Sequence, residues 1–426
     1  MIRLRRGGRI ALGVILTTIL IDFMGYLLLL PVLPEHLKGL GARETSDQGL
    51  IIGLYMFALV VALPIWGWMA DRVGRRPVLL TCLLGTSFSF ALMAASQDLG
   101  LFYLARVLQG VFGASVGTAQ AYISDLTREE DRARGFGLIG AAGSLGLLGG
   151  PALGGALYRV DPILPFQAPA VLAVVAAFGA ALFLPESRGP SFGKAPAKDL
   201  LRSIVPAPLW ILFGVHQPRI LLYLYLFFHL FVAFGAVEAM FPNYFDVVFE
   251  WDPGQVGLFL TYVGLITAIT QGLLIGRLIR VFGELPLVLG GLAIATGAMF
   301  ALTQLSSLGL LALAGLALAV GFGAVVPTFT SMFSKACGDD ETGAFHAHSQ
   351  AMLNLGRGVG AFLGGVVAGH LGAAAPFLLG SLALLGALGI LGVASPWLRV
   401  RVGPPKDPSS RSGHSSGERE TAARAP

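Results

Sequence analysis

Charged residues are scarce in this chain of 426 residues. Asp, Glu, Lys and Arg make up 12% of it, against about 25% in an ordinary soluble domain. Apolar residues make up 55%, and the mean hydropathy is +0.76. These values exclude a water-soluble globule and a disordered chain, because disorder requires low hydrophobicity. The 58 glycines follow no Gly-X-Y period, which excludes a collagen-like chain and leaves a protein that crosses a membrane many times.

Cysteine is almost absent. Cys82 lies in an apolar run and Cys337 in a loop, and neither belongs to a CxxC motif or a Cys/His cluster. This pattern excludes a disulfide framework and a thiolate metal site. We therefore expect no metal and no cofactor.

Catalytic motifs are also lacking. The sequence has no phosphate-binding Walker loop, no zinc-protease motif and no GxSxG nucleophile elbow. An ATP-driven pump and a membrane hydrolase are thus without support, and we expect a protein that is not an enzyme and draws its energy from an ion gradient. Its net charge of +5 comes from basic residues in loops rather than on one folded face, so no nucleic-acid partner is predicted.

Long apolar runs are the dominant feature that is present. A membrane-spanning helix takes about 20 mostly apolar residues. Twelve such runs cover residues 10–33, 49–69, 78–96, 100–123, 135–157, 165–185, 219–245, 255–278, 285–304, 307–333, 343–370 and 374–398. The first run is too long for a secretory signal and should remain as a helix. The fold class predicted is an all-α polytopic membrane protein with twelve transmembrane helices.

Basic residues alternate between the two sides of these runs. The two termini and the even-numbered loops hold 24 of the 29 Lys and Arg residues, and the odd-numbered loops hold only Lys38, Arg43 and Arg159. Because basic loops stay on the cytoplasmic side, both termini are predicted to be cytoplasmic, in a cell (inner or plasma) membrane. The two remaining basic residues, Arg106 and Arg357, fall within spans and require an explanation.

The two halves of the chain resemble each other. Four glycines of the fifth run (146, 150, 154 and 155) recur in the eleventh run at an offset of 210 residues, and Gly67 and Gly74 recur 209 residues later. This indicates a duplicated six-helix unit, hence two bundles related by pseudo-twofold symmetry. The predicted divisions are residues 1–185 and 219–398 for the bundles, 186–218 for a cytoplasmic linker with a short interfacial helix over 200–213, and 399–426 for a disordered cytoplasmic tail.

A glycine- and arginine-rich segment connects the second and third runs. It contains Gly67, Asp71, Arg72, Gly74, Arg75 and Arg76. Gly67 should allow close helix approach, Gly74 should form a turn, and Asp71 should pair with a guanidinium. The segment resembles the signature loop of the major facilitator superfamily, and Arg106 with Gln109-Gly110 is similar to its second motif. The resemblance implies alternating access, and a cytoplasmic ionic lock of Asp71 and Arg75 with Asp125 that forms when the protein faces outward.

The fifth apolar run indicates which branch of the superfamily the chain resembles. Its residues Gly137, Gly146, Gly150, Pro151, Gly154 and Gly155 have the spacing of the antiporter motif. Glycines permit close helix packing, and Pro151 removes a backbone donor, so helix packing without a transport role remains an alternative. The pattern is similar to twelve-helix drug:proton antiporters, including tetracycline exporters. Counting from the shared motifs, the intramembrane acids of tetracycline exporters fall at Ser89 and Ile294 and their histidine at Thr267, so tetracycline is not the expected substrate.

Few acids lie inside the runs. A carboxylate in a membrane is costly and is by default a candidate proton carrier. Asp22 and Glu238 qualify, with a structural role as the alternative for each. The resemblance ties Arg106 to proton coupling, so Asp22 with Arg106 is the predicted charge pair. The proton-coupling residues predicted are therefore Asp22, Arg106 and Glu238.

Polar and aromatic side chains within the runs form the predicted substrate cavity. His346, Gln350, Asn354 and Arg357 make a stripe on one helical face, which must face protein or water. Aromatic rings offer surfaces to a lipophilic compound. The cavity residues predicted are Tyr26, Gln109, Phe112, Phe234, Gln350, Asn354 and Arg357.

Together these features predict a proton-coupled exporter of small lipophilic or cationic drugs. Its partners are a small-molecule substrate and the lipid bilayer, and the protein is expected to be a monomer. Two alternatives stay open. One is a proton-coupled or facilitative transporter of an endogenous metabolite, and the other is a receptor without transport.

Overall fold

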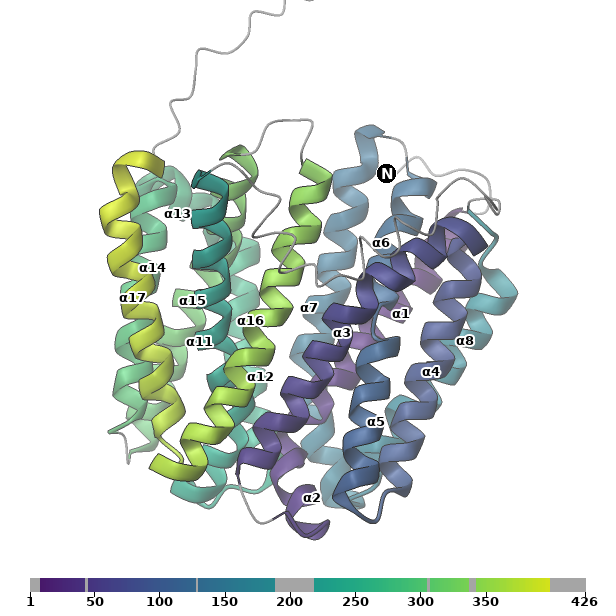
Figure 1. Ribbon diagram of the computed structural model, residues 1–426, viewed down its shortest axis with the longest axis horizontal. Coiled ribbons are helices and arrows are strands. Elements are labelled where there is room, and N and C mark those ends of the chain that lie inside the picture. The colour runs from purple at the N-terminus through teal and green to yellow at the C-terminus, as the bar shows by residue number, and fades with distance from the viewer. Residues whose placement is uncertain are drawn as a thin grey trace, which may run out of the picture.

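The predicted all-α fold is confirmed. A computed structural model describes residues 8–42, 45–127, 129–187, 218–304, 307–336 and 342–398. Within these residues, 12 helices are long and apolar enough to cross a membrane, one for each predicted run. They stand roughly side by side along one direction (Figure 1).

The first six spans form the amino-terminal half. Its elements are α1 (Gly8–Leu28), η1 (Leu30–Val32), α2 (Leu33–Gly39), α3 (Ser46–Val73), α4 (Arg75–Ala95), α5 (Leu99–Phe112), α6 (Ser115–Leu126), α7 (Glu129–Val160) and α8 (Leu164–Phe183). Local sequence sets several boundaries. Asp98 caps α5 by accepting a hydrogen bond from the Leu101 amide, and Gly74 separates α3 from α4 with a φ of 111° that favours glycine.

The last six spans form the carboxyl-terminal half. Its elements are α11 (Pro218–Phe249), α12 (Pro253–Ile269), η2 (Thr270–Leu274), α13 (Ile275–Phe282), α14 (Glu284–Leu302), α15 (Leu308–Ala336), α16 (Thr342–Leu371) and α17 (Ala375–Leu398). Asp252 and Gln255 cap α12 reciprocally in a capping box. Gly283 separates α13 from α14 with a φ of 79°, repeating the role of Gly74 in the first half. The predicted interfacial helix over 200–213 and the predicted tail over 399–426 lie outside the described residues.

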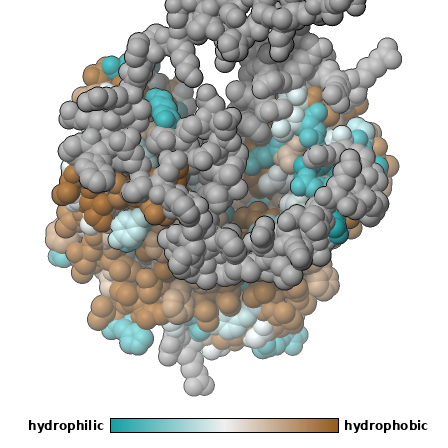
Figure 2. Space-filling model, turned by 45° about the horizontal axis from the view of Figure 1, so that its top comes forward, coloured by the Kyte–Doolittle hydropathy of each residue, from teal (hydrophilic) through white to brown (hydrophobic). Residues whose placement is uncertain are grey.

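The two ends of the molecule differ in charge. We call the end where α3 meets α4 the basic end, since it carries Arg72, Arg75 and Arg76, and α13 brings Arg277 and Arg280 to it. The opposite end, where α2 meets α3, is the sparse end. In Figure 1 the basic end is at the top. Figure 2 shows brown, hydrophobic residues over much of the visible flank below that end, as expected of a surface that faces lipid.

Two predicted spans are interrupted. The fourth breaks between α5 and α6 at Gly113 and Ala114, and the eighth contains the π-helix η2 between α12 and α13. Glycine lies in both interruptions, at Gly113 and Gly272. A π-helical turn is an uncommon feature that often marks a functional position in a helix.

The glycine motif of α7 packs this helix on α1. A Cβ added at Gly146 would lie 2.8 Å from the Leu20 carbonyl oxygen, and one at Gly150 would lie 3.0 Å from that of Met24. Gly154 similarly contacts the Leu28 backbone. Gly137 is different, since nothing lies within 4 Å of its added Cβ, so close packing does not explain this member of the motif.

The equivalent glycines of α16 pack in the same way on α11. Gly356 and Gly364 lie against the carbonyl oxygens of Phe228 and Ala236, where an added Cβ would be 2.7 and 2.9 Å away, and Gly360 contacts Val232. The offset of 210 residues in the sequence thus corresponds to the same helix contact in each half.

The last glycine of each set joins the halves. Gly155 of α7 packs on Pro253 and Gly254 of α12, while Gly365 of α16 would bring an added Cβ to 2.8 Å from the Gly49 Cα of α3. These contacts lie toward the sparse end. In Figure 1, α3 and α16 diverge from there toward the basic end.

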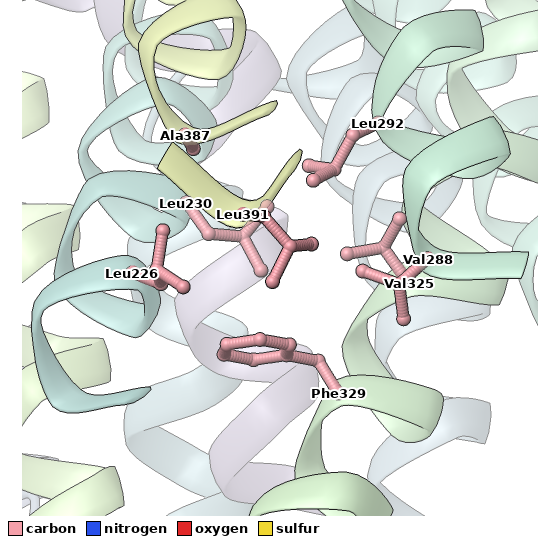
Figure 3. A pocket seen from close by; sticks show the side chains of 8 residues that line it. All are labelled: Leu226, Leu230, Val288, Leu292, Val325, Phe329, Ala387 and Leu391. Carbon is pink, nitrogen blue, oxygen red and sulfur yellow. The ribbon is translucent and has the colours of Figure 1, made fainter. Parts of the chain in front are cut away.

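The carboxyl-terminal half has its own apolar core. α11, α14, α15 and α17 enclose a void of about 10 Å³ (Figure 3). Its lining is entirely apolar: Leu226, Leu230, Val288, Leu292, Val325, Phe329, Ala387 and Leu391. A void of this size holds at most about one water and, without polar partners, stays dry. It is a packing defect of one half and lies apart from the interface between the halves.

Candidate functional site

A buried ion pair lies in the membrane-spanning part of the carboxyl-terminal half. Arg357 of α16 donates from Nη2 to both carboxylate oxygens of Glu238 on α11, at 2.6 and 2.7 Å, and from Nε to Oε2 at 3.0 Å. The side chains are 18% and 11% exposed. An intramembrane charge normally requires such a partner. The pair explains why the charge of Arg357 is tolerated inside a span. It joins Glu238, a predicted proton-coupling residue, with Arg357, a predicted cavity residue.

Arg357 also connects the two halves. Its Nη2 lies 3.3 Å from the hydroxyl oxygen of Tyr26 on α1, and its guanidinium carbon lies 5.3 Å from the centre of the Tyr26 ring. Phe234, one turn before Glu238 on α11, presents its ring to the same guanidinium at 5.7 Å. A single cation is thus shared by an acid of one half and a phenol of the other.

Tyrosine stacking extends this arrangement to Arg106. The rings of Tyr26 and Tyr55 stack with centroids 5.2 Å apart, and the Arg106 guanidinium carbon lies 5.0 Å from the Tyr55 centroid. Arg106 is 1% exposed and donates from Nη1 to Gln109 Oε1 at 2.6 Å. We call Tyr26, Tyr55, Arg106, Gln109, Glu238 and Arg357 the central cluster. Tyr55 of α3 is the member that the sequence analysis missed, because an uncharged tyrosine does not stand out within an apolar run.

The predicted pair of Asp22 with Arg106 is not formed in this structure. Ser115, at the first position of α6, donates to Asp22 Oδ2 at 2.5 Å instead. Arg106 lies on α5, on the other side of the break at Gly113 and Ala114 from Ser115, and donates to Gln109. Among the described residues Arg106 forms no ion pair with a carboxylate, and its Nε has no hydrogen-bond partner.

The other predicted cavity residues lie in different surroundings. Phe112 packs within the first half, 5.9 Å from the Trp66 ring and against Gly85, rather than in the central cluster. Asn354 is buried, whereas Gln350 is exposed. The side chain of His346 lies outside the described residues. No group of three His, Cys, Asp or Glu side chains that would suit a metal occurs in the part of the chain described.

The signature loop at the basic end contains the predicted ionic contact. Arg75 Nη2 lies 2.8 Å from Asp71 Oδ1, and Arg75 Nε lies 3.6 Å from Asp125 Oδ2. The turn expected at Gly74 is confirmed by its positive φ. The close approach expected at Gly67 is wrong, because nothing lies within 4 Å of an added Cβ. Gly67 instead lines a cavity of about 190 Å³ together with Trp66, Asp71, Arg75 and Thr118, where a larger side chain would occupy that space.

Glu186, just after α8, is a further member of this loop network. Its carboxylate accepts hydrogen bonds from the backbone amides of Arg75 at 2.9 Å and Arg76 at 3.2 Å. A negative charge at the first residues of α4 is favoured by the helix dipole. Ser187 donates to Asp125 of α6 at 3.0 Å. The two residues after α8 thus contact both the start of α4 and the end of α6. The sequence analysis missed Glu186, although an acid directly after a span was the signal available.

Two ion pairs connect the halves at the sparse end. Lys38 of α2 lies 2.6 Å from Asp246 of α11, and Arg159 of α7 lies 2.9 Å from Asp252 before α12. The hydrogen bonds from Arg159, more than any other interaction, hold the pKa of Asp252 below its ordinary value. Gln48 adds a buried hydrogen bond from Nε2 to the Ala239 carbonyl at 2.7 Å.

The chain is similar in sequence and in fold to known proteins. The chain is 30% identical over 373 residues to the tetracycline resistance protein, class C, of Escherichia coli, covering 81% of this chain and 86% of that protein. It is 28% identical over 360 residues to multidrug resistance protein 1 of Bacillus subtilis, covering 84% and 90%. A crystal structure of the human organic anion transporter MFSD10 (TETRAN) superposes with a TM-score of 0.69 at 24% identity, covering 90% and 99%.

The similarity to resistance proteins confirms the predicted likeness to the tetracycline and multidrug exporters, and these relatives are transporters rather than enzymes. The family model described as Major Facilitator Superfamily matches residues 15–347 and, in a second match, residues 249–425. With its twelve spans, its signature loop and these matches, the chain belongs to the major facilitator superfamily.

Proposed function

We propose that the protein is a proton-coupled exporter of small lipophilic compounds that works by alternating access. The observation that carries this proposal is the buried pair of Glu238 with Arg357, because Arg357 also contacts Tyr26 of the opposite half. An acid that changes its charge inside the membrane at the contact between two moving halves is suited to couple a proton to their motion. The tetracycline and multidrug resistance relatives support export as the direction.

The basic end is assigned to the cytoplasm in this proposal. The excess of Lys and Arg in the loops at that end supports the assignment, which puts both termini in the cytoplasm of a cell inner or plasma membrane. The contacts of Gly155 and Gly365 and the ion pairs of Lys38 and Arg159 then lie on the outer side. With that side held together, we assign the structure to the inward-facing state.

The contact of Arg75 with Asp125 is present in this inward-facing state. Under this assignment the contact forms without the outward-facing state, and the state dependence of the ionic lock stays a prediction. Both residues belong to the first half, so the contact stabilises that half internally. Its role in the cycle is to keep the loop rigid while the halves move relative to each other.

Two carboxylates carry the proton. Protonation of Glu238 removes the charge that pairs with Arg357, which weakens the link between α11 and α16 at the central cluster. Asp22, hydrogen-bonded to Ser115 at the break between α5 and α6, supplies a second acid in the first half. For antiport, the protonated form and the substrate-bound form must favour different states of the two halves.

The substrate binds between the halves at the central cluster. Tyr26, Tyr55 and Phe234 offer ring faces there, and aromatic faces suit flat lipophilic compounds. The bilayer is the second partner, and the protein functions as a monomer, since each half packs against the other within one chain.

Transport into inverted membrane vesicles tests this function. A panel of fluorescent lipophilic dyes should accumulate when a proton gradient is imposed, and the accumulation should stop when a proton ionophore is added. Vesicles prepared without the protein serve as the control for leak through the membrane. Accumulation that ignores the ionophore would remove proton coupling and leave facilitated transport.

A further inference from the structure

The start of α3 rests on the crossing of α11 and α16. An added Cβ at Gly235 of α11 would lie 2.6 Å from the Arg357 Cα, so these two helices touch within one turn of Glu238. Gly53 of α3 approaches the same place from the first half, since its added Cβ would lie 3.2 Å from the Gly358 carbonyl oxygen. The first turns of α3 therefore contact the two helices that the ion pair of Glu238 with Arg357 joins.

Gln48, in the first turn of α3, forms a buried hydrogen bond between the halves. Its Nε2 donates to the Ala239 carbonyl oxygen of α11 at 2.7 Å, and the residue is 3% exposed. The charged contacts at the sparse end are different, because the Lys38 and Arg159 side chains are 55% and 53% exposed and water competes for them. A buried amide that loses its acceptor has no water to replace it. Loss of the Gln48 contact is therefore the more costly step when the sparse end loosens.

Pro242 explains why a side chain of α3 bonds to the backbone here. It lies inside α11 and has no N–H, so the Glu238 carbonyl lacks its usual helical donor four residues later. In membrane helices, neighbouring helices supply donors to the backbone groups around such a proline. Gln48 supplies one at the next residue, Ala239. The hydrogen bond therefore holds α11 at the turn that the proline interrupts, which is the turn that carries Glu238.

Asp47 anchors the same turn of α3 to its own half. Its carboxylate accepts a hydrogen bond from the Tyr103 hydroxyl of α5 at 2.6 Å. Two adjacent residues are thus tied to opposite halves, Asp47 to α5 and Gln48 to α11. Because Asp47 limits how far Gln48 can follow α11, movement of α11 away from the first half breaks the bond to Ala239.

We propose that Gln48 is the positioning residue that keeps the sparse end closed, by fixing the α11 backbone directly after Glu238. This inference rests on the proposed function, since it takes closure of the sparse end as one state of the alternating cycle. Closure and the pairing of Glu238 with Arg357 then require the same position of α11. Gln48 itself carries no proton and belongs to no part of the central cluster.

Spin labels across the sparse end test this role in the full-length protein. The labels are attached at Val160→Cys of α7 and Val247→Cys of α11, which are 77% and 61% exposed, after replacement of the two native cysteines. Gln48→Met keeps the length of the side chain and removes its donor. We expect the ratio of open to closed molecules to rise about 5-fold, as the loss of one hydrogen bond permits. Gln167→Met is the control, because Gln167 is exposed at the same end on α8, and it should leave the ratio unchanged. A wild-type ratio in Gln48→Met overturns the proposal.

Gln48→Glu separates hydrogen bonding from packing. A protonated carboxyl has nearly the shape of the amide and donates an O–H to the Ala239 carbonyl, whereas the ionised form has no donor and repels that oxygen. The spin-label distance in Gln48→Glu should therefore be shorter in acid than the distance in Gln48→Met at the same pH. If the two variants have the same distance at every pH, packing alone explains position 48 and the proposal is overturned.

Failure of this inference and failure of the proposed function have different signatures, because the spin-label measurements need neither a substrate nor a proton gradient. If they support the role of Gln48 while dye accumulation in vesicles ignores the ionophore, the sparse end is held as inferred and proton coupling is wrong. If accumulation requires the proton gradient while Gln48→Met has the wild-type ratio, the exporter function stands and the role of Gln48 is wrong.

Discussion

We assign proton coupling to single residues inside the membrane-spanning part of this transporter. Asp22 and Glu238 are the two acids at depth, and the structure gives them different partners: a serine hydroxyl for Asp22 and a guanidinium for Glu238. A hydrogen bond from a neutral group and an ion pair respond differently to a mutation that removes the charge. The two acids can therefore be separated by experiment.

Replacing Asp22 with asparagine should abolish gradient-driven transport, because an amide cannot carry a proton. Insertion into the membrane should be unaffected, since the amide still accepts a hydrogen bond from Ser115. Ser115→Ala is the companion variant, and it should only shift the pH dependence of transport. The measurement is dye accumulation in inverted vesicles. Wild-type proton-coupled flux in Asp22→Asn would remove Asp22 as a carrier and leave that role to Glu238.

Replacing Glu238 with glutamine should destabilise the protein. The change leaves Arg357 buried without its counter-charge, which costs about 3 to 5 kcal/mol in comparable buried pairs. The control is Glu284→Gln, which breaks the surface pair with Lys335 at 2.7 Å and should cost less than about 1 kcal/mol. Thermal unfolding in detergent measures both. Equal effects of the two variants would contradict a buried pair at Glu238.

Only some of the side-chain contacts inside the membrane-spanning part could be predicted from the sequence. The acids and arginines inside the spans were identified because charge stands out in an apolar run. The pairing of these residues was not predicted. Asp22 was matched with Arg106, whereas Glu238 and Arg357, 119 residues apart, form the pair. Helix rotation and depth decide such contacts, and a run of apolar residues specifies neither.

At the scale of helices, glycine spacing was the more reliable signal. The offset of 210 residues predicted a duplicated bundle, and each copy of the motif packs its helix on the first helix of its own half. The sequence analysis missed the interruptions of the fourth and eighth spans. In each of them the apolar run continues, through Gly113 in the fourth and through η2 in the eighth. The break at Gly113 matters, since it puts Ser115 at the start of α6, within reach of Asp22.

A leucine at position 150 should disturb the contact of α7 with α1. The added side chain would meet the backbone at Met24 and the side chain of Leu27, both 3.0 Å from its Cβ. We expect the variant to insert but to lose export, with proton leak as the two helices separate. Gly149→Leu is the matched control on the next residue, where an added Cβ meets nothing within 4 Å. Vesicle transport and pH decay measure both effects, and wild-type export by Gly150→Leu would show that this packing is not needed for coupling.

At the scale of the whole molecule, the relative position of the halves depends on few polar contacts. Lys38 with Asp246 and Arg159 with Asp252 lie at the sparse end and are partly exposed, so each contributes little on its own. Weak contacts fit the alternating access that we propose, in which the halves separate at this end in every cycle. The apolar and glycine contacts behind them provide the remaining attachment.

Variants of the pair of Arg159 with Asp252 test how far this ion pair holds the sparse end closed. Arg159→Asp and Asp252→Arg should each favour opening at the sparse end through repulsion, and the double variant should restore the closed state because the pair is re-formed in reverse. Spin labels on α7 and α12, in a protein without Cys82 and Cys337, report the distance between the halves.

The direction of the pH effect follows from the lowered pKa of Asp252. Because the folded-state pKa lies below its ordinary value, the pair stabilises closure at all pH values above that ordinary value, and this contribution is lost as the pH falls through the lowered pKa. The spin-label distance should consequently stay constant through the neutral range and lengthen only in strong acid. In Asp252→Asn, which has no carboxylate to protonate, the lengthening in strong acid should be absent. A wild-type distance that changes near neutral pH would assign the pH dependence of opening to the intramembrane acids instead, and would leave this outer pair a passive contact.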